Sequence, residues 1–147
     1  MLVTRQPIDN ARLEVTAYEL LFRSLSRDAL SGDVGTRATA RLIVDSLMEQ
    51  GTQVLTEGHP AHVNFTRDLT VEGYAHAIPP RSVVIEVLED VPPDAEVLES
   101  LRRLRQAFDR IALDDVHETA RAEAFAAVAT AVKVDLPYVD VKDLPGW

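Results

Sequence analysis

The sequence of 147 residues contains no cysteine. This absence excludes disulfides, thiolate catalysis and zinc sites built on cysteine. Aromatic residues make up only 5% of the chain, and no apolar run reaches the roughly 18 residues that a membrane-spanning helix needs. The amino-terminal segment MLVTRQPID lacks the layout of a signal peptide. We therefore expect a cytoplasmic protein without a membrane segment.

Basic residues are also scarce, since 15 lysines and arginines face 24 acidic residues and give a formal charge of −9. This balance argues against non-specific binding to nucleic acid or to an anionic membrane surface. The hydrophobic fraction of 46% is enough for a folded core. The length corresponds to one domain, but it is short for a complete eight-fold α/β barrel, which typically has about 250 residues.

Apolar runs alternate with helical patterns along the chain. The strands Leu2–Ile8 and Val15–Phe22 flank the turn-like Asp9-Asn10-Ala11 and predict an opening hairpin. Further strands are predicted at His62–Thr66, Val83–Leu88, Ile111–Leu113 and Val132–Leu136. Helices are predicted from Thr36 to Gly51, from Arg67 to Ala77, after the capping residue Asp94, and over residues 120–131. From residue 60 onward this alternation favours parallel strands with right-handed crossovers, and hence an α/β fold.

Polar residues interrupt five of the predicted strand segments. They are Glu19 in AYELLF, Asn64 in HVNFT, Glu86 in VIEVLE, Asp114 in IALDD and Lys133 in AVKVDL. One such side chain can simply face water. Carboxylates that are buried without partners are costly, so a series of them on successive strands indicates that they face solvent together or surround a cation. In a parallel barrel, groups near the carboxyl ends of the strands converge on one pocket.

Three acids and an amide offer only oxygen ligands, which suit Mg²⁺ or Mn²⁺ better than zinc or copper. The adjacent Asp114 and Asp115 could bridge two such ions, an arrangement used for displacement at phosphorus. Lys133 could orient a water molecule or balance developing negative charge. The four histidines (59, 62, 76 and 117) show no metal-ligand spacing, so we expect them in loops or at the surface and assign them no role.

The same segments resemble, in order and approximate spacing, the motifs of the bacterial EAL domain family, the fold of cyclic di-GMP phosphodiesterases. The matching segments are RQPI at 5–8, AYELLFR at 17–23, VNFT at 63–66, IEVLE at 85–89, IALDD at 111–115 and VKVD at 132–135. The residues of these segments are most similar to those of the EAL modules found with HDOD domains, many of which are degenerate. The resemblance implies a partial TIM-type barrel of about six strands with an amino-terminal hairpin. It also implies a single EAL-like domain over residues 1–147 that lacks the carboxyl-terminal part of the full barrel.

The resemblance also implies roles for individual residues. Glu19, Asn64, Glu86 and Asp114 would bind a first Mg²⁺ or Mn²⁺ ion, and Asp115 would help to hold a second one. Lys133 would lie beside the nucleophilic water. Gln6 and Arg23 would contact cyclic di-GMP, with the Arg23 guanidinium suited to phosphate oxygens.

Three departures from the family pattern weigh against catalysis. The EAL tripeptide is Glu19-Leu20-Leu21, and Asp115 is followed by Val116-His117-Glu118 where the family has a glycine-bearing loop. The sequence also stops at Trp147, before the family's later metal-binding glutamate and its guanine-contacting glutamine. We therefore expect a degenerate, catalytically inactive signalling module that acts through protein contacts or through weak binding of metal or nucleotide.

The sequence is also compatible with a second function. The chain could be an active, metal-dependent cyclic di-GMP phosphodiesterase completed by dimerisation or by sequence absent from this chain. A flavodoxin-like receiver domain is disfavoured, because its acid pair follows the first strand whereas Asp114 and Asp115 come late. A glycosidase is disfavoured because nothing in the sequence suggests a sugar-binding platform. We further expect a protein partner or a homodimer, because the last strand would expose an unpaired edge unless Tyr138–Trp147 or a second subunit covers it.

Overall fold

The computed structural model describes residues 2–23, 45, 51–78, 80–108, 110–117 and 119–134. The predicted helix from Thr36 to Gly51 lies outside these residues, except for Asp45 and Gly51. The tail Tyr138–Trp147, predicted to cover the last strand, also lies outside them.

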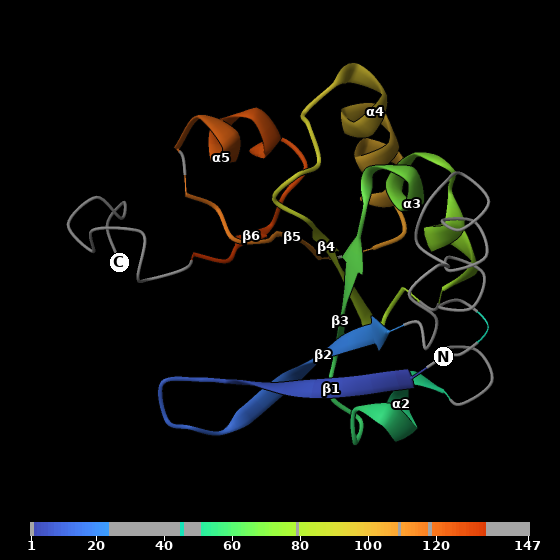
Figure 1. The fold of residues 1–147 in the computed structure, drawn as a ribbon, viewed down its shortest axis with the longest axis vertical. Coiled ribbons are helices and arrows are strands. Elements are labelled where there is room, and N and C mark those ends of the chain that lie inside the picture. Colours follow the sequence, from blue (N-terminus) through green and yellow to red (C-terminus); the bar gives the residue numbers. More distant parts are fainter. Residues whose placement is uncertain are drawn as a thin grey trace.

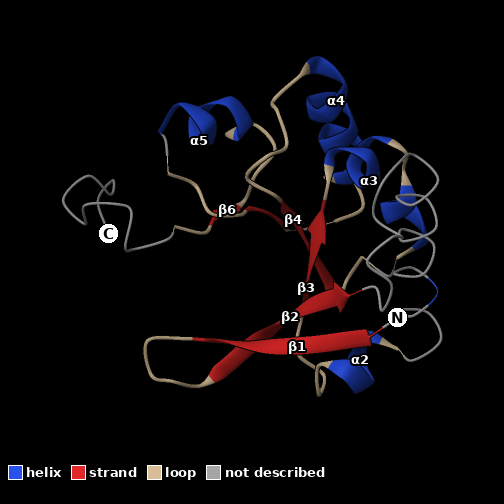
Figure 2. Cartoon of the chain, viewed as in Figure 1, coloured by secondary structure: helices blue, strands red, loops and turns tan. Residues whose placement is uncertain are grey.

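One sheet contains six strands, arranged in the order in which they occur along the chain (Figure 2). The strands are β1 (Leu2–Asp9), β2 (Val15–Arg23), β3 (Ala61–Phe65), β4 (Val83–Val87), β5 (Ile111–Leu113) and β6 (Ala131–Val132). β1 and β2 form an antiparallel hairpin, and the strands from β2 to β6 run parallel. Within the described residues β1 and β6 are the two ends of this sheet, so it is an open part of a barrel. This architecture confirms the predicted partial TIM-type fold.

Helices lie mainly along one side of the curved sheet, where α3, α4 and α5 are seen together (Figure 1). The described helices are α2 (Thr52–Leu55), α3 (Arg67–Val71), a short 3-10 helix (Tyr74–Ala77), α4 (Ala95–Leu104) and α5 (Thr119–Phe125). Asp94 caps α4 as predicted, because its side chain accepts a hydrogen bond of 2.9 Å from the Val97 amide. None of the helices in the described part of the chain is long and apolar enough to span a bilayer.

Two helices differ from their predicted extents. The helix expected from Arg67 to Ala77 is interrupted at Gly73, whose φ of 77° is left-handed and favours glycine. The helix expected over residues 120–131 ends at Phe125. Thr130 lies next to β5, where it exchanges hydrogen bonds with the Ile111 backbone, and this contact starts the pairing of β6.

The hydrophobic core fills the space between the sheet and these helices. Side chains alternate across a strand, so Val63, Phe65 and Ile85 point toward the helices. They belong to the same buried cluster as Leu101 from α4 and Phe125 from α5. His62, Asn64 and Glu86 alternate with these positions on β3 and β4 and carry polar side chains on the opposite side of the sheet, which also holds the buried Val84. Polar side chains that could bind a ligand therefore lie on the face of the sheet opposite the helices.

Candidate functional site

The strand register gathers polar side chains on the face opposite the helices. Glu19 on β2 pairs with His62 on β3, and Asn64 on β3 pairs with Glu86 on β4. Asp114 follows β5 directly, and its amide donates a hydrogen bond of 2.9 Å to the carbonyl of Val87. Residues from β2, β3, β4 and β5 thus meet toward the carboxyl ends of the parallel strands, which is where barrel folds place their sites.

Lys133 lies at the centre of this group. Its Nζ atom is 2.7 Å from Asp114 Oδ1, 3.2 Å from Glu86 Oε2 and 3.5 Å from Glu19 Oε2. Glu86 is fully buried, and Asp114 is nearly so. Buried carboxylates need a compensating positive charge. One ammonium group therefore contacts three carboxylates from three different parts of the sequence and offsets part of their negative charge.

The Lys133 ammonium stays charged at neutral pH. Burial opposes its charge, but the hydrogen bond to Asp114 and the charges of Glu86, Asp114 and Glu19 outweigh burial and raise its pKa. The backbone holds the lysine in place, since its amide donates to the Leu113 carbonyl at 2.8 Å and its carbonyl accepts from the Val116 amide at 2.9 Å. The backbone of Lys133 is therefore held by β5 through its amide and by the segment that follows β5 through its carbonyl.

Asn64 completes a set of oxygen donors. Its Nδ2 atom donates to Glu19 Oε1 at 2.9 Å. Its Oδ1 atom is buried, and the described residues offer it no hydrogen-bond partner. A buried amide oxygen without a donor, next to carboxylates, is suited to a cation. The donor set of Glu19, Asn64, Glu86 and Asp114 consists only of hard oxygen atoms, which fits Mg²⁺ or Mn²⁺.

His62 contacts the same group from the side, with its Nδ1 atom 2.6 Å from Glu86 Oε1. Burial acts to raise the pKa of Glu86, but the hydrogen bond from His62 and the charge of Lys133 together lower it. The folded state consequently favours the ionised form of Glu86, and this preference contributes stability above the ordinary pKa of 4.5.

The lowered pKa of Glu86 predicts a specific loss of stability in acid. As the pH falls below 4.5 toward the lowered folded pKa, the contribution from this carboxylate should disappear. Glu86→Gln cannot titrate, so its free energy of unfolding should fall less steeply than that of the wild type over this range. Urea denaturation between about pH 3 and pH 6 measures both slopes. Equal slopes of the free energy of unfolding against pH would show that ionisation of Glu86 does not contribute to stability.

A second acidic group adjoins the first. Carboxylate oxygens of Glu89, Asp114 and Asp115 lie within 4.8 Å of one another. Asp115 adopts a left-handed backbone conformation with a φ of 39°. The next residue, Val116, is 6% exposed and packs into the hydrophobic core. The chain after Asp115 is thus anchored by an apolar side chain and by a backbone bond to Lys133.

The two residues predicted to contact a nucleotide lie on the hairpin. Gln6 is exposed on β1 and pairs with Glu19 in the antiparallel register. Arg23 ends β2, and its side chain lies outside the part of the chain that is described. Gln6 is therefore next to the acidic group in register, and its role stays a prediction, as does that of Arg23.

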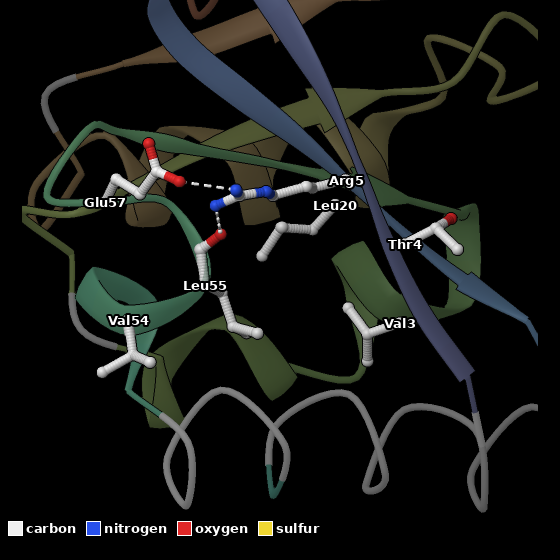
Figure 3. A pocket seen from close by; sticks show the side chains of 7 residues that line it. All are labelled: Val3, Thr4, Arg5, Leu20, Val54, Leu55 and Glu57. Carbon is white, nitrogen blue, oxygen red and sulfur yellow. Dashed lines mark hydrogen bonds and ion pairs between the residues drawn. The ribbon is translucent and has the colours of Figure 1, made fainter.

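A hollow of about 430 Å³ lies apart from these residues, between the hairpin and the segment around α2 (Figure 3). Arg5 crosses it, with Nη1 donating to the Leu55 carbonyl at 2.8 Å and Nη2 paired with Glu57. None of the predicted site residues lines this hollow. It therefore gives no support to the predicted chemistry, which lies on the other face of the sheet.

The sequence gives His62 no role, because the four histidines are expected in loops or at the surface, although His62 also starts the predicted strand His62–Thr66. The residue lies inside β3, and its side chain is only 17% exposed. One signal was present in the sequence, because His62 precedes Asn64 by two positions and therefore faces the same side of the strand. Its contact with Glu86 depends on the pairing of β3 with β4, which the sequence alone does not specify.

Fold and side chains together define an open α/β barrel segment with an acidic, oxygen-rich centre at its strand ends. No family model matches the chain. Solved structures with the same fold include an EAL domain protein from Listeria monocytogenes, with a TM-score of 0.68, 17% identity and coverage of 98% of this chain and 67% of that one. The PaMucR phosphodiesterase in complex with c-di-GMP has a TM-score of 0.69 and 18% identity, with coverage of 98% and 74%. The chain therefore has the fold of EAL domains, as the sequence motifs predicted.

Two curated relatives are similar in sequence. The chain is 36% identical over 115 residues to the uncharacterized protein YuxH of Bacillus subtilis, a match covering 78% of this chain and 28% of YuxH. It is 32% identical over 135 residues to the cyclic di-GMP phosphodiesterase CdgJ of Vibrio cholerae, a match covering 91% of this chain and 31% of CdgJ. The chain thus spans less than a third of the length of either relative.

Proposed function

We propose that this chain is an EAL-type module of cyclic di-GMP signalling that works by binding, through protein contacts or weak metal and nucleotide binding, and not by turnover. The observation that carries the proposal is the group of acids around Lys133, in a chain similar to CdgJ and to the nucleotide-bound PaMucR. Gln6 and Arg23 are the proposed nucleotide contacts, and the compartment is the cytoplasm.

Mg²⁺ or Mn²⁺ would be held by Glu19, Asn64, Glu86 and Asp114, with Asp115 assisting at a second ion. Such an ion supplies a polarising charge for phosphate oxygens and an activated water. In this chain Lys133 already supplies positive charge at the same acids. An arriving ion must therefore displace the ammonium or share the acids with it, which favours weak binding.

The segment after Asp115 supports the absence of catalysis. The EAL pattern has a glycine-bearing loop here, whereas this chain has Val116 packed in the core. An anchored valine cannot reproduce the freedom of a glycine loop, so a second ion would lack its supporting loop. Loss of such preorganised charge stabilisation costs several kcal/mol of transition-state stabilisation, which corresponds to about 10³-fold in rate.

The test combines a titration and a turnover assay on the same sample. Cyclic di-GMP is titrated with and without Mg²⁺, and hydrolysis is then followed by chromatography. We expect hydrolysis to be at least about 10³-fold slower than that of an active phosphodiesterase assayed in parallel. Glu19→Ala serves as the control for contaminating activity, because any genuine turnover must disappear in this variant.

The second candidate is an active phosphodiesterase whose site is completed by another copy or by further sequence. The convergence of four oxygen donors, with the Asn64 oxygen left without a donor among the described residues, favours it. Normal turnover that Glu19→Ala abolishes would establish this candidate and refute the inactive module.

A further inference from the structure

The two carboxylate oxygens of Glu86 contact different partners. Oε1 lies 2.6 Å from His62 Nδ1, and Oε2 lies 3.2 Å from Lys133 Nζ. The Glu86 side chain is fully buried, and the His62 side chain is 17% exposed. A buried carboxylate held at both oxygens has a fixed orientation, and here only Oε2 contacts the lysine that also contacts Glu19 and Asp114.

The histidine acts as the donor in this contact. An ionised carboxylate only accepts hydrogen bonds, so a separation of 2.6 Å requires a proton on Nδ1. His62 and Asn64 lie two positions apart on β3, and Asn64 is the residue paired with Glu86 on β4. His62 therefore contacts Glu86 Oε1 from β3, whereas Lys133 contacts Oε2.

We propose that His62 is a positioning residue that occupies Glu86 Oε1, so that Oε2, which Lys133 also contacts, is the one oxygen of Glu86 that a divalent cation can use. The inference rests on the proposed cation site at Glu19, Asn64, Glu86 and Asp114. Glu86 then binds an ion through a single oxygen. Calcium sites of six to eight ligands commonly use a bidentate carboxylate, whereas Mg²⁺ takes single oxygens in an octahedral arrangement. His62 consequently biases the site toward Mg²⁺ and Mn²⁺ and against Ca²⁺.

Two variants separate positioning from folding. His62→Leu removes the donor, and His62→Gln keeps an amide donor at the same place. Affinities for Mg²⁺, Mn²⁺ and Ca²⁺ are measured by calorimetry on chains shown to be folded by circular dichroism. For His62→Leu we expect the ratio of Ca²⁺ to Mg²⁺ affinity to rise about tenfold or more, in line with the effects of removing outer-sphere partners of metal ligands. For His62→Gln we expect a ratio within about threefold of the wild type, smaller than that outer-sphere effect.

An unchanged ratio in folded His62→Leu overturns the proposal while leaving the cation site intact. A wild-type chain that binds none of the three ions overturns both the proposal and the cation site. If His62→Leu does not fold, nitrogen-15 NMR of the wild type decides. The Nδ1 proton of His62 must stay hydrogen-bonded when Mg²⁺ is added, and its loss on Mg²⁺ binding would show that Glu86 uses both oxygens.

Discussion

Lys133→Met should destabilise the chain by about 3 kcal/mol when divalent cations are removed with a chelator. The substitution leaves Glu19, Glu86 and Asp114 facing one another without the ammonium that contacts all three. Removing one partner of a buried ion pair costs about 3–5 kcal/mol, and the low end applies because the Lys133 side chain is 34% exposed. Chemical denaturation at neutral pH measures the loss.

The raised pKa of Lys133 determines the pH range in which this difference in stability can be measured. Its contribution is fully present below the ordinary pKa of 10.5 and is lost only as the pH rises toward the higher folded pKa. At neutral pH the effect of the substitution is therefore complete. Arg103→Met, on the exposed side of α4, is the matched control and should change stability by less than about 0.5 kcal/mol.

Adding Mg²⁺ or Mn²⁺ gives Lys133→Met a second readout. An ion that binds the folded state stabilises it by mass action. Without the Lys133 ammonium, the acidic group should bind Mg²⁺ or Mn²⁺ more tightly than it does in the wild type. We expect the midpoint temperature of Lys133→Met to recover on addition of Mn²⁺ and that of the wild type to change less. A variant as stable as the wild type in chelator would contradict the role given to Lys133.

Phe125→Ala should destabilise the chain by about 3–5 kcal/mol. The ring of Phe125 is fully buried at the end of α5. It also supports the Arg121 guanidinium, which lies 5.0 Å from the ring centroid. Arg121 donates to the carbonyls of Leu88 and Val91 at 2.6 and 2.7 Å, so α5 is fastened to the segment that carries Glu89.

Urea denaturation of Phe125→Ala, Arg121→Met and Glu123→Ala separates these contributions. Glu123 is exposed, so Glu123→Ala should lower the free energy of unfolding by less than about 0.5 kcal/mol. Arg121→Met should lower it less than Phe125→Ala does, because it creates no large cavity. If Phe125→Ala were no worse than Glu123→Ala, α5 would not be part of the cooperative core.

The strands could be predicted because their apolar runs are short, dense and bounded by turn residues. Val83–Val87 on β4 is an example, in which every position is buried and only Glu86 is polar. That Glu19, Asn64, Glu86 and Asp114 lie toward one edge of the sheet could also be predicted, because parallel strands bring their carboxyl ends to one edge. Helix extents were less predictable. The break at Gly73 and the early end of α5 depend on local backbone geometry and on contacts with β5.

Contacts between particular atoms could not be predicted. Nothing in AVKVDL indicates that the lysine would lie between three acids, because that position depends on the pairing of β5 with β6. The partner of His62 similarly depends on the register of β3 against β4. Sequence patterns thus identify which side chains share a face, while the sheet register decides which oxygen meets which nitrogen.

The order of the strands has a consequence for synthesis on the ribosome. Each strand from β2 to β6 pairs with the strand made just before it, so the sheet can grow one strand at a time as the chain emerges. Lys133 is separated from Glu86 by 47 positions and from Glu19 by 114. The strands that carry the acids can therefore pair before Lys133, which supplies the positive charge, has been synthesised. Within the described part of the chain β6 is made last, so Lys133 joins the acids only after the strands that carry them have paired.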